Sequence, residues 1–285
     1  MADKNGINHL HLVACLLVVL AGGCTTTLSP GGGAGSGNGA VLDDRAANEV
    51  NINSLTEVIK QNPADPNAYN TRGSAYARIR QYDAALKDFN RAIQLNPAFA
   101  EAYANRGLLY RQTGKTDAAM ADFTRSINSN ASYAPAYLGR GNLNRLKGNY
   151  PAALEDLNKA IRLNPESAEA AHARGLLYQK QGRHQDAVMD FNAAIDRNPF
   201  AAPPYLARGQ SLTAIGRYDR AMEDFNAALS VDNKLADAWA GRGYIHEKKN
   251  ERKEAVEAYQ AALTIDRNNA LARQGMNRLG TGLFR

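Results

Sequence analysis

The sequence predicts an all-α protein, an α-solenoid superhelix of six helix pairs with a single capping helix at each end. The first observation is a repeated phrase. RGLLYRQTGKTDAAMADF at residues 106–123 returns as RGLLYQKQGRHQDAVMDF at residues 174–191, an offset of 68 residues. The second is the period, because units of 34 residues, half that offset, fit six times from residue 66 to residue 269 without an insertion. A fixed period of this length is typical of stacked repeats, each too small to bury its apolar face alone.

Each unit carries small and large residues at fixed positions. Position 8 is glycine and position 20 is alanine in all six units. Large residues at positions 4 and 11 share one face of a first helix, and those at 20, 24 and 27 share one face of a second. Position 24 is occupied by Phe89, Phe123, Leu157, Phe191, Phe225 and Tyr259. The pattern therefore predicts two amphipathic helices per unit that approach closely at the small residues.

The turn inside each unit is predicted from position 15. Four units have glycine there, at Gly114, Gly148, Gly182 and Gly216. Glycine suits the left-handed residue that follows a helix end. Asn250 can adopt the same conformation, whereas Arg80 suits it less well. The acidic residues that follow, such as Asp83 and Asp219, are then expected to be N-caps of the second helices.

This arrangement of small and aromatic residues resembles the tetratricopeptide repeat, or TPR. The resemblance covers the six units 66–99, 100–133, 134–167, 168–201, 202–235 and 236–269. It implies a solenoid in which the first helices line a concave groove. Two departures are visible: three units lack the proline expected at position 32, and Asn144 and His246 replace the aromatic residue expected at position 11.

Single capping helices are predicted at both ends of the array. Residues 44–63 match the second helix of a truncated earlier unit, because Leu55, Val58 and Ile59 would hold positions 24, 27 and 28. Residues 270–285 are expected to form a lone first helix and a short tail. End caps with a polar outer face are what a solenoid requires for solubility.

The N-terminus has the features of an export signal. The apolar run LVACLLVVLAG at residues 12–22 is shorter than the roughly 20 residues that span a bilayer. The sequence Ala21-Gly22-Gly23-Cys24 that ends it resembles a bacterial lipobox, although Ala21 stands where that family prefers leucine. The resemblance implies a signal peptide over residues 1–23 and a Cys24 that carries palmitate-type acyl chains. An ordinary cleaved signal with an incidental cysteine is the alternative.

The residues after Cys24 indicate where the protein is held. Thr25 stands where an aspartate would retain a lipoprotein in the inner membrane, so it implies the outer membrane, with the protein facing the periplasm. Residues 24–43 include the stretch TTTLSPGGGAGSGNGA, whose glycines predict a flexible tether. No strand precedes these glycines, so they do not indicate a nucleotide-binding loop.

Composition and motifs argue against several classes of function. The formal net charge is +6, with Lys and Arg interspersed among acids, which argues against a nucleic-acid binder. The repeats contain no cysteine and no metal-ligand spacing of histidines. Gly114-Lys115-Thr116 resembles the end of a P-loop, but Leu109 stands where its first glycine is required. We therefore expect no enzyme, no metal and no cofactor.

A charge pattern repeats with the units. Every unit has arginine at position 7: Arg72, Arg106, Arg140, Arg174, Arg208 and Arg242. Five units have aspartate at position 23: Asp88, Asp122, Asp156, Asp190 and Asp224. Both positions are predicted to be partly buried, where an unpaired charge costs several kcal/mol, so we expect structural ion pairs. Pairing within a unit leaves Arg242 without a partner, whereas pairing each aspartate with the next unit leaves Arg72 facing Ser54.

The resemblance also implies which residues face the groove, at positions 2, 5, 6, 9, 12 and 13. The candidates are Asn70, Arg78, Asn105, Arg111, Asn142, Arg145, Gln179, Lys180 and Gln210. Amides can bond an extended peptide backbone, and the cations favour acidic segments or a terminal carboxylate. The carboxylate clamp of some TPR proteins is not matched, because Asn70 and Ser74 hold clamp positions and its lysine is missing.

These observations favour a lipid-anchored periplasmic TPR scaffold that binds a protein or peptide partner in its concave groove. NlpI-type lipoproteins, which bring proteases to cell-wall hydrolases, resemble this design. The alternative is an assembly factor for a pilus or secretion machine at the outer membrane, as in TPR lipoproteins of type IV or Tad pili. The sequence leaves the identity of the partner and the oligomeric state open.

Overall fold

The computed structural model describes residues 38–280, and of residues 38–48 only the backbone. The chain divides into two units, Met1–Leu42 and Asp43–Arg285. The predicted signal peptide, Cys24, most of the predicted tether and residues 281–285 lie outside the described residues. The second unit contains the repeats, and it is the unit described below.

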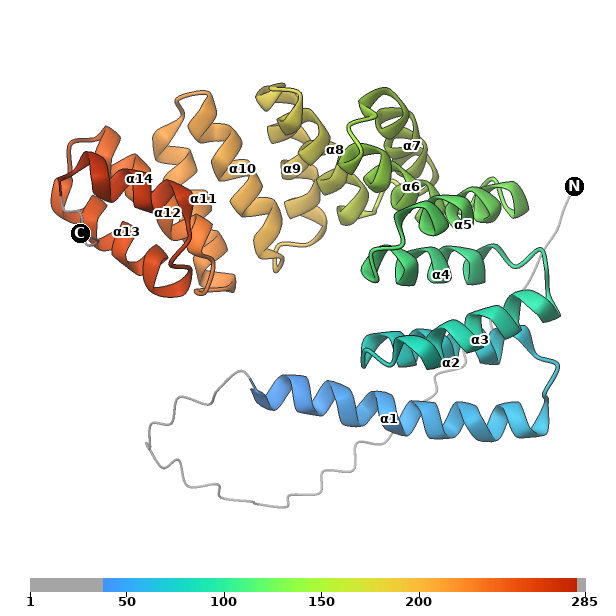
Figure 1. The fold of residues 1–285 in the computed structure, drawn as a ribbon. Helices are drawn as coiled ribbons and strands as arrows, with labels where there is room; N and C mark the ends of the chain where they lie inside the picture. The colour runs from blue at the N-terminus through green and yellow to red at the C-terminus, as the bar shows by residue number, and fades with distance from the viewer. Residues whose placement is uncertain (1–37, 281–285) are drawn as a thin grey trace, which may run out of the picture. The chain divides into compact units, whose positions relative to one another are not determined.

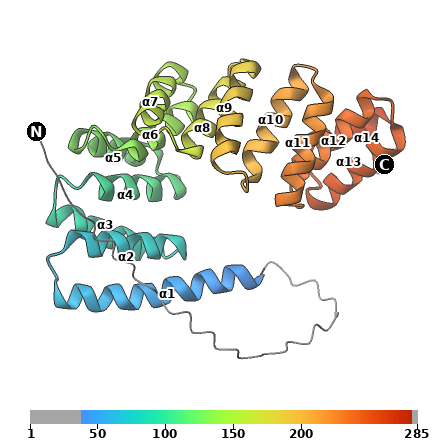
Figure 2. The ribbon, with the colours of Figure 1, turned by 180° about the vertical axis from the view of Figure 1, so that it is seen from behind.

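The described residues form fourteen helices and no strand. The helices are α1 (Asn38–Gln61), α2 (Pro66–Arg78), α3 (Tyr82–Leu95), α4 (Ala100–Gln112), α5 (Thr116–Ser129), α6 (Ala134–Leu146), α7 (Tyr150–Leu163), α8 (Ala168–Lys180), α9 (His184–Arg197), α10 (Ala202–Ala214), α11 (Tyr218–Val231), α12 (Ala236–Lys248), α13 (Arg252–Ile265) and α14 (Ala270–Arg278). Each predicted 34-residue unit is one helix pair, and the pairs follow one another in sequence order (Figures 1 and 2). The predicted all-α solenoid of six pairs is therefore confirmed.

The first helices of the pairs lie together on one side of the stack. Each of α2, α4, α6, α8 and α10 contacts the first helix of the next pair, and α12 contacts α14. No two second helices contact each other within the described residues. The stack must therefore bend toward the first helices, and we call the surface that they form the inner face.

The large residue at position 24 holds neighbouring pairs together. Phe123 is fully buried and packs against Gly107 of its own pair and Gly139 of the next first helix. A Cβ atom built on these glycines would lie 3.0 Å and 2.4 Å from the ring. The ring thus fills space that only glycine leaves open, and one side chain joins three helices of two units.

The residues at position 15, in the turns within the pairs, adopt the left-handed backbone conformation. Arg80 and Asn250 adopt positive φ angles of 62° and 61°, as glycine does in the other four turns. In arginine this conformation brings steric strain on the Cβ atom.

Asp83 and Asp219 are not N-caps, because α3 and α11 begin one residue before them and show no side-chain cap bond. Their carboxylates lie in the first turn instead, where they interact favourably with the helix dipole.

Helix α1 begins earlier than the sequence predicted. It starts at Asn38, six residues before residue 44, so the end of the predicted tether is helical. The glycine-rich stretch ends at Gly39, and the next residues, AVLDDRAA, contain no helix breaker. At the other end, α14 occupies Ala270–Arg278 as the expected lone first helix.

Replacing Gly175 with alanine tests the close approach of ring and backbone. Alanine normally stabilises a helix interior by about 0.5–1 kcal/mol relative to glycine. Here the new Cβ would lie 2.6 Å from the Phe191 ring. Overpacking of this kind costs about 1–3 kcal/mol, so we expect Gly175→Ala to lower the free energy of unfolding in urea.

The exposed Gln185 of α9 provides the control for this substitution. Gln185→Ala should change stability by less than about 0.5 kcal/mol. A Gly175→Ala protein as stable as wild type would show that the helices can separate at no cost.

Candidate functional site

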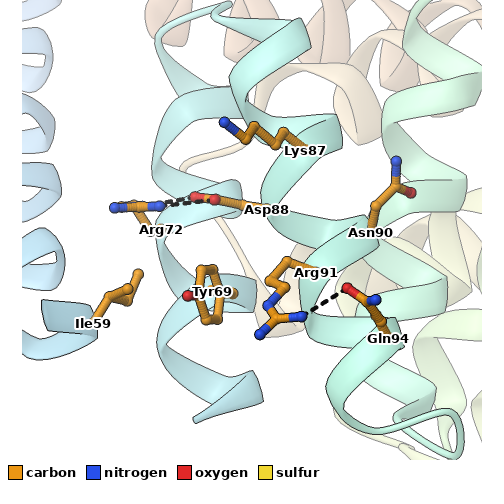
Figure 3. Close-up of a pocket in the computed structure, with 8 residues that line it drawn as sticks. All are labelled: Ile59, Tyr69, Arg72, Lys87, Asp88, Asn90, Arg91 and Gln94. Atoms are coloured by element: carbon orange, nitrogen blue, oxygen red, sulfur yellow. Dashed lines mark hydrogen bonds and ion pairs between the residues drawn. The ribbon is translucent and has the colours of Figure 1, made fainter. Parts of the chain in front are cut away.

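The arginines at position 7 bind the aspartates at position 23 of their own units. Arg72 donates from Nε to Asp88 Oδ2 at 2.7 Å and from Nη2 to Oδ1 at 2.9 Å, and Figure 3 shows this pair. The same two-bond geometry recurs in Arg106–Asp122, Arg140–Asp156, Arg174–Asp190 and Arg208–Asp224. Of the two possible registers, the structure therefore has pairing within the unit. We call these five pairs the Arg–Asp ladder.

A third contact connects each ladder arginine to the preceding unit. Arg106 Nη1 donates to Asn90 Oδ1 at 2.6 Å, and Arg174 Nη1 donates to Asn158 Oδ1 at 2.8 Å. The equivalent partners of Arg72, Arg140 and Arg208 are Thr56, Thr124 and Asn192. These five acceptors all hold position 25 of their units, and each of them is Thr or Asn. This recurrence was the available signal in the sequence, but the sequence analysis missed it.

The ladder is structural rather than available to a partner. The aspartate side chains are 1–8% exposed and the arginine side chains 13–25%. The hydrogen bonds that these arginines donate to the aspartates raise the pKa of Arg72, Arg140, Arg174 and Arg208 above the usual value. Asn144, one of the departures at position 11, donates to Asp156 and joins its pair.

Arg242 is the exception in the sixth unit, where Ala258 stands at position 23. Its Nε is buried without a hydrogen-bond partner. Its guanidinium lies over the Trp239 ring, 4.8 Å from the ring centre. Burial lowers the pKa of Arg242, the reverse of the direction in the ladder.

One pocket adjoins the first pair of the ladder. It has a volume of about 660 Å³ and is lined by Ile59 of α1, by Tyr69 and Arg72 of α2, and by residues of α3 (Figure 3). Most of its charged groups are already engaged, because Arg72 binds Asp88 and Arg91 donates to Gln94 at 2.7 Å. This pocket is therefore a weaker candidate for ligand binding than the inner face.

Three of the predicted groove amides tie first helices together. Asn105 Nδ2 donates to Asn70 Oδ1 at 3.0 Å, from α4 to α2. Gln179 Nε2 donates to the Ala207 carbonyl and to Ser211 Oγ, both at 3.1 Å, from α8 to α10. These side chains are on the inner face as expected, but they bridge neighbouring units.

The other six predicted groove residues form no side-chain hydrogen bond within the described part of the chain. They are Arg78, Arg111, Asn142, Arg145, Lys180 and Gln210. Two hollows contain some of them: one of about 490 Å³ includes Arg78 beside Asn105, and one of about 370 Å³ includes Gln210 beside Tyr244. The free polar groups among these six residues are thus mainly cationic.

Arg145 and His172 interact electrostatically across neighbouring first helices. The Arg145 Nε is buried without a hydrogen-bond partner, and burial lowers the pKa of its guanidinium. His172, on the next first helix, packs beside Phe191, with 5.6 Å between ring centres. Burial and then the charge of Arg145 lower the pKa of His172. His172 holds position 5 and Arg145 holds position 12, and the TPR resemblance places both positions in the groove. This was the available signal for His172 in the sequence.

No group of three or more His, Cys, Asp or Glu in residues 38–280 could hold a metal ion. Within the same residues, every helix is too short or too polar to cross a membrane.

Comparison with sequence profiles of known families identifies the repeats. A profile described as "TPR repeat" matches residues 81–114, 141–182 and 209–250. Profiles described as "Tetratricopeptide repeat" match residues 236–269, 100–133 and 168–200. Together these matches cover more than half of the chain. No curated protein matches the sequence.

Solved structures with the same fold include proteins of diverse roles. A chain in the crystal structure of the APC/C hetero-tetramer Cut9–Hcn1 matches with a TM-score of 0.72 at 18% identity, covering 84% of this chain and 48% of that one. This chain therefore spans about half the length of that relative. Pseudomonas aeruginosa pilF matches with a TM-score of 0.68 at 15% identity, covering 75% and 97%. YrrB, described as a TPR protein with an unusual peptide-binding site, matches with a TM-score of 0.55 at 26% identity, covering 66% and 97%.

Removing one aspartate of the ladder should be strongly destabilising. Asp190 is 8% exposed and binds Arg174, so Asp190→Ala leaves a partly buried guanidinium without its carboxylate. We expect a loss of about 3 kcal/mol in the free energy of unfolding, measured in urea.

The matched control is Asp117→Ala. Asp117 is 94% exposed and pairs with Lys147 at 3.0 Å. Its loss should cost less than about 1 kcal/mol. Equal effects of the two substitutions would contradict a structural role for the ladder.

Proposed function

Because the chain belongs to the tetratricopeptide repeat family, we propose that it is a scaffold without catalytic activity, which binds an acidic segment of a protein partner on its inner face. The observation that carries this proposal is the buried Nε of Arg145, which has no hydrogen-bond partner. A buried donor without an acceptor is unfavourable, and a carboxylate from a partner would supply the acceptor.

The surroundings of Arg145 support an acidic partner. Arg111 and Lys180 lie at the ends of the neighbouring first helices α4 and α8. Neither they nor Arg145 form an ion pair with any described residue. Leu146, 68% exposed beside Arg145, adds an apolar contact. An extended acidic peptide would find charge, amides and apolar surface along one line of helices.

The likeness to YrrB is consistent with this assignment. YrrB is a TPR protein with an unusual peptide-binding site, and its identity with this chain is 26%. The first helices follow one another along the inner face in sequence order, so this surface is elongated. An elongated peptide is therefore a better match to the inner face than a compact ligand.

The scaffold that we propose is held at the outer membrane by acyl chains on Cys24 and faces the periplasm. The apolar run before Cys24 and Thr25 after it support this part. An assembly factor for a pilus or secretion machine would use the same anchor and repeats. Crosslinking in intact cells, followed by identification of the bound protein, separates the two roles: a hydrolase or protease favours the adaptor, and pilus or secretion subunits favour the assembly factor.

Arg145→Ala tests the peptide site directly. The probe is a fluorescein-labelled peptide of alternating Glu and Ser, with a Gln–Ser peptide as its uncharged counterpart, followed by fluorescence anisotropy. Loss of a charge-assisted hydrogen bond should weaken binding of the Glu peptide about tenfold or more. Arg162→Ala, on the second helix α7, removes the same charge away from the inner face and should leave affinity unchanged. Equal affinity of the two variants would refute the site.

His172 makes the same interaction dependent on pH. Its pKa is lowered in the free protein, and a bound carboxylate would raise it in the complex. The complex then holds the proton more tightly, so affinity should rise as pH falls through the raised pKa and level off below the lowered one. The measurement runs from neutral pH to about pH 5.5, above the ordinary glutamate pKa of about 4.3.

His172→Gln should abolish this rise in affinity, and His184→Gln, on a second helix, should preserve it. A wild-type affinity that does not change with pH would exclude a carboxylate next to His172.

A further inference from the structure

The sixth unit interrupts the Arg–Asp ladder at a single position. Asp224 of the fifth unit binds both Nε and Nη2 of Arg208, at 2.8 and 2.6 Å. At the equivalent place in the sixth unit, Ala258 has no carboxylate to offer. The five intact pairs show how a carboxylate is bound at this point of the fold.

Arg242 keeps its position although its partner is missing. Its Nε is buried and unpartnered, and its two Nη nitrogens have no partner among the described residues. Since only Nε is among the buried unpartnered atoms, the Nη nitrogens are open to solvent. The side chain therefore presents a row of N–H donors that leads from the surface to a buried atom.

Trp239 does not replace the missing carboxylate. The Arg242 guanidinium lies 4.8 Å from the centre of the indole ring, whereas that of Arg208 lies 5.7 Å from Tyr205. A ring below the guanidinium interacts with its flat face. The N–H bonds point outward in the plane of the group and still lack acceptors. The indole thus forms one wall of the site and leaves the edge of the guanidinium free.

We propose that the sixth unit contains a carboxylate-binding site formed by Arg242 and Trp239 beside the buried Ala258, where a carboxylate from another molecule binds the accessible edge of the guanidinium that the missing aspartate leaves without an acceptor. A planar carboxylate matches the two parallel N–H donors of a guanidinium. Asn226, at position 25 of the fifth unit, is exposed and holds the position from which Asn192 accepts a bond from Arg208. The site is built from ladder positions, so it does not depend on the inner face or on the function proposed above.

The ligand chemistry is a carboxylate, which a small organic acid and the side chain of a protein partner share. The only tryptophan of the chain is Trp239, so its fluorescence reports on this site alone. The first probe is sodium acetate, titrated against sodium chloride at equal ionic strength. We expect a saturable change in fluorescence with acetate and no saturable change with chloride.

Two variants identify the site. Ala258→Asp supplies the carboxylate from within the chain, so it should abolish the response to acetate and raise the midpoint of thermal unfolding. Arg242→Met removes the donors and should also abolish the response. It should remain folded, as judged by circular dichroism, because Arg242 has no polar partner among the described residues that its loss would leave unpaired.

A second pair of probes distinguishes the sources of the carboxylate. Acetyl-Gly-Glu-Gly-amide is compared with acetyl-Gly-Gln-Gly-amide. If the Glu peptide binds more tightly than acetate, the site takes an acidic side chain of a protein. If both bind equally, it takes a small carboxylate, and the Gln peptide should not bind in either case.

The proposal is overturned if acetate gives no saturable response. It is also overturned if folded Arg242→Met, or Ala258→Asp, responds as wild type does. Failure of Arg145→Ala to affect peptide binding would leave this result unchanged, because Arg145 lies on the inner face of the third unit.

Discussion

The packing of the position-24 side chain against glycine is the contact on which the rest of the structure depends. Phe225 is buried between Gly209 of its own unit and Gly241 of the next. The same ring therefore closes one helix pair and starts the interface with the following pair. A unit of 34 residues cannot bury this side chain alone, so stability increases only when units are stacked. The glycine at position 8 recurs in every unit, so each position-24 side chain closes its own helix pair in the same way.

The Arg–Asp ladder adds specificity to this packing. Buried ion pairs add little net stability, because desolvation of the charges offsets their attraction. Their geometry is demanding, however, and each arginine also bonds to position 25 of the preceding unit. A slip between units would leave several buried charges unpaired. The ladder can thus select one stacking register, and the sixth unit, where Ala258 interrupts it, is where an arginine becomes available for another purpose.

The inner face divides its polar residues between two roles. The amides of Asn105 and Gln179 are engaged by neighbouring first helices, which helps to set the spacing of those helices. The cations have no such partners among the described residues, and Arg145 retains a buried nitrogen without an acceptor. The same surface therefore contains groups that are satisfied within the chain and groups that require an external acceptor. This contrast makes the third and fourth units the best-supported binding region.

The sequence by itself determined the helices, their period and the residues between them. Gly at position 8, Ala at position 20 and a large residue at position 24 recur because close packing of two helices admits few alternatives. Asp83 was predicted to be the N-cap of α3, but the N-cap is Gln81, two residues earlier. The cap position depends on where the first helical turn begins. Only the tertiary structure decided which aspartate each arginine binds, that Asn70 and Asn105 bond to each other, and that the charge of Arg145 acts on His172. A period places residues on helix faces, but contacts between faces depend on how helices cross, and no local pattern in the chain specifies that.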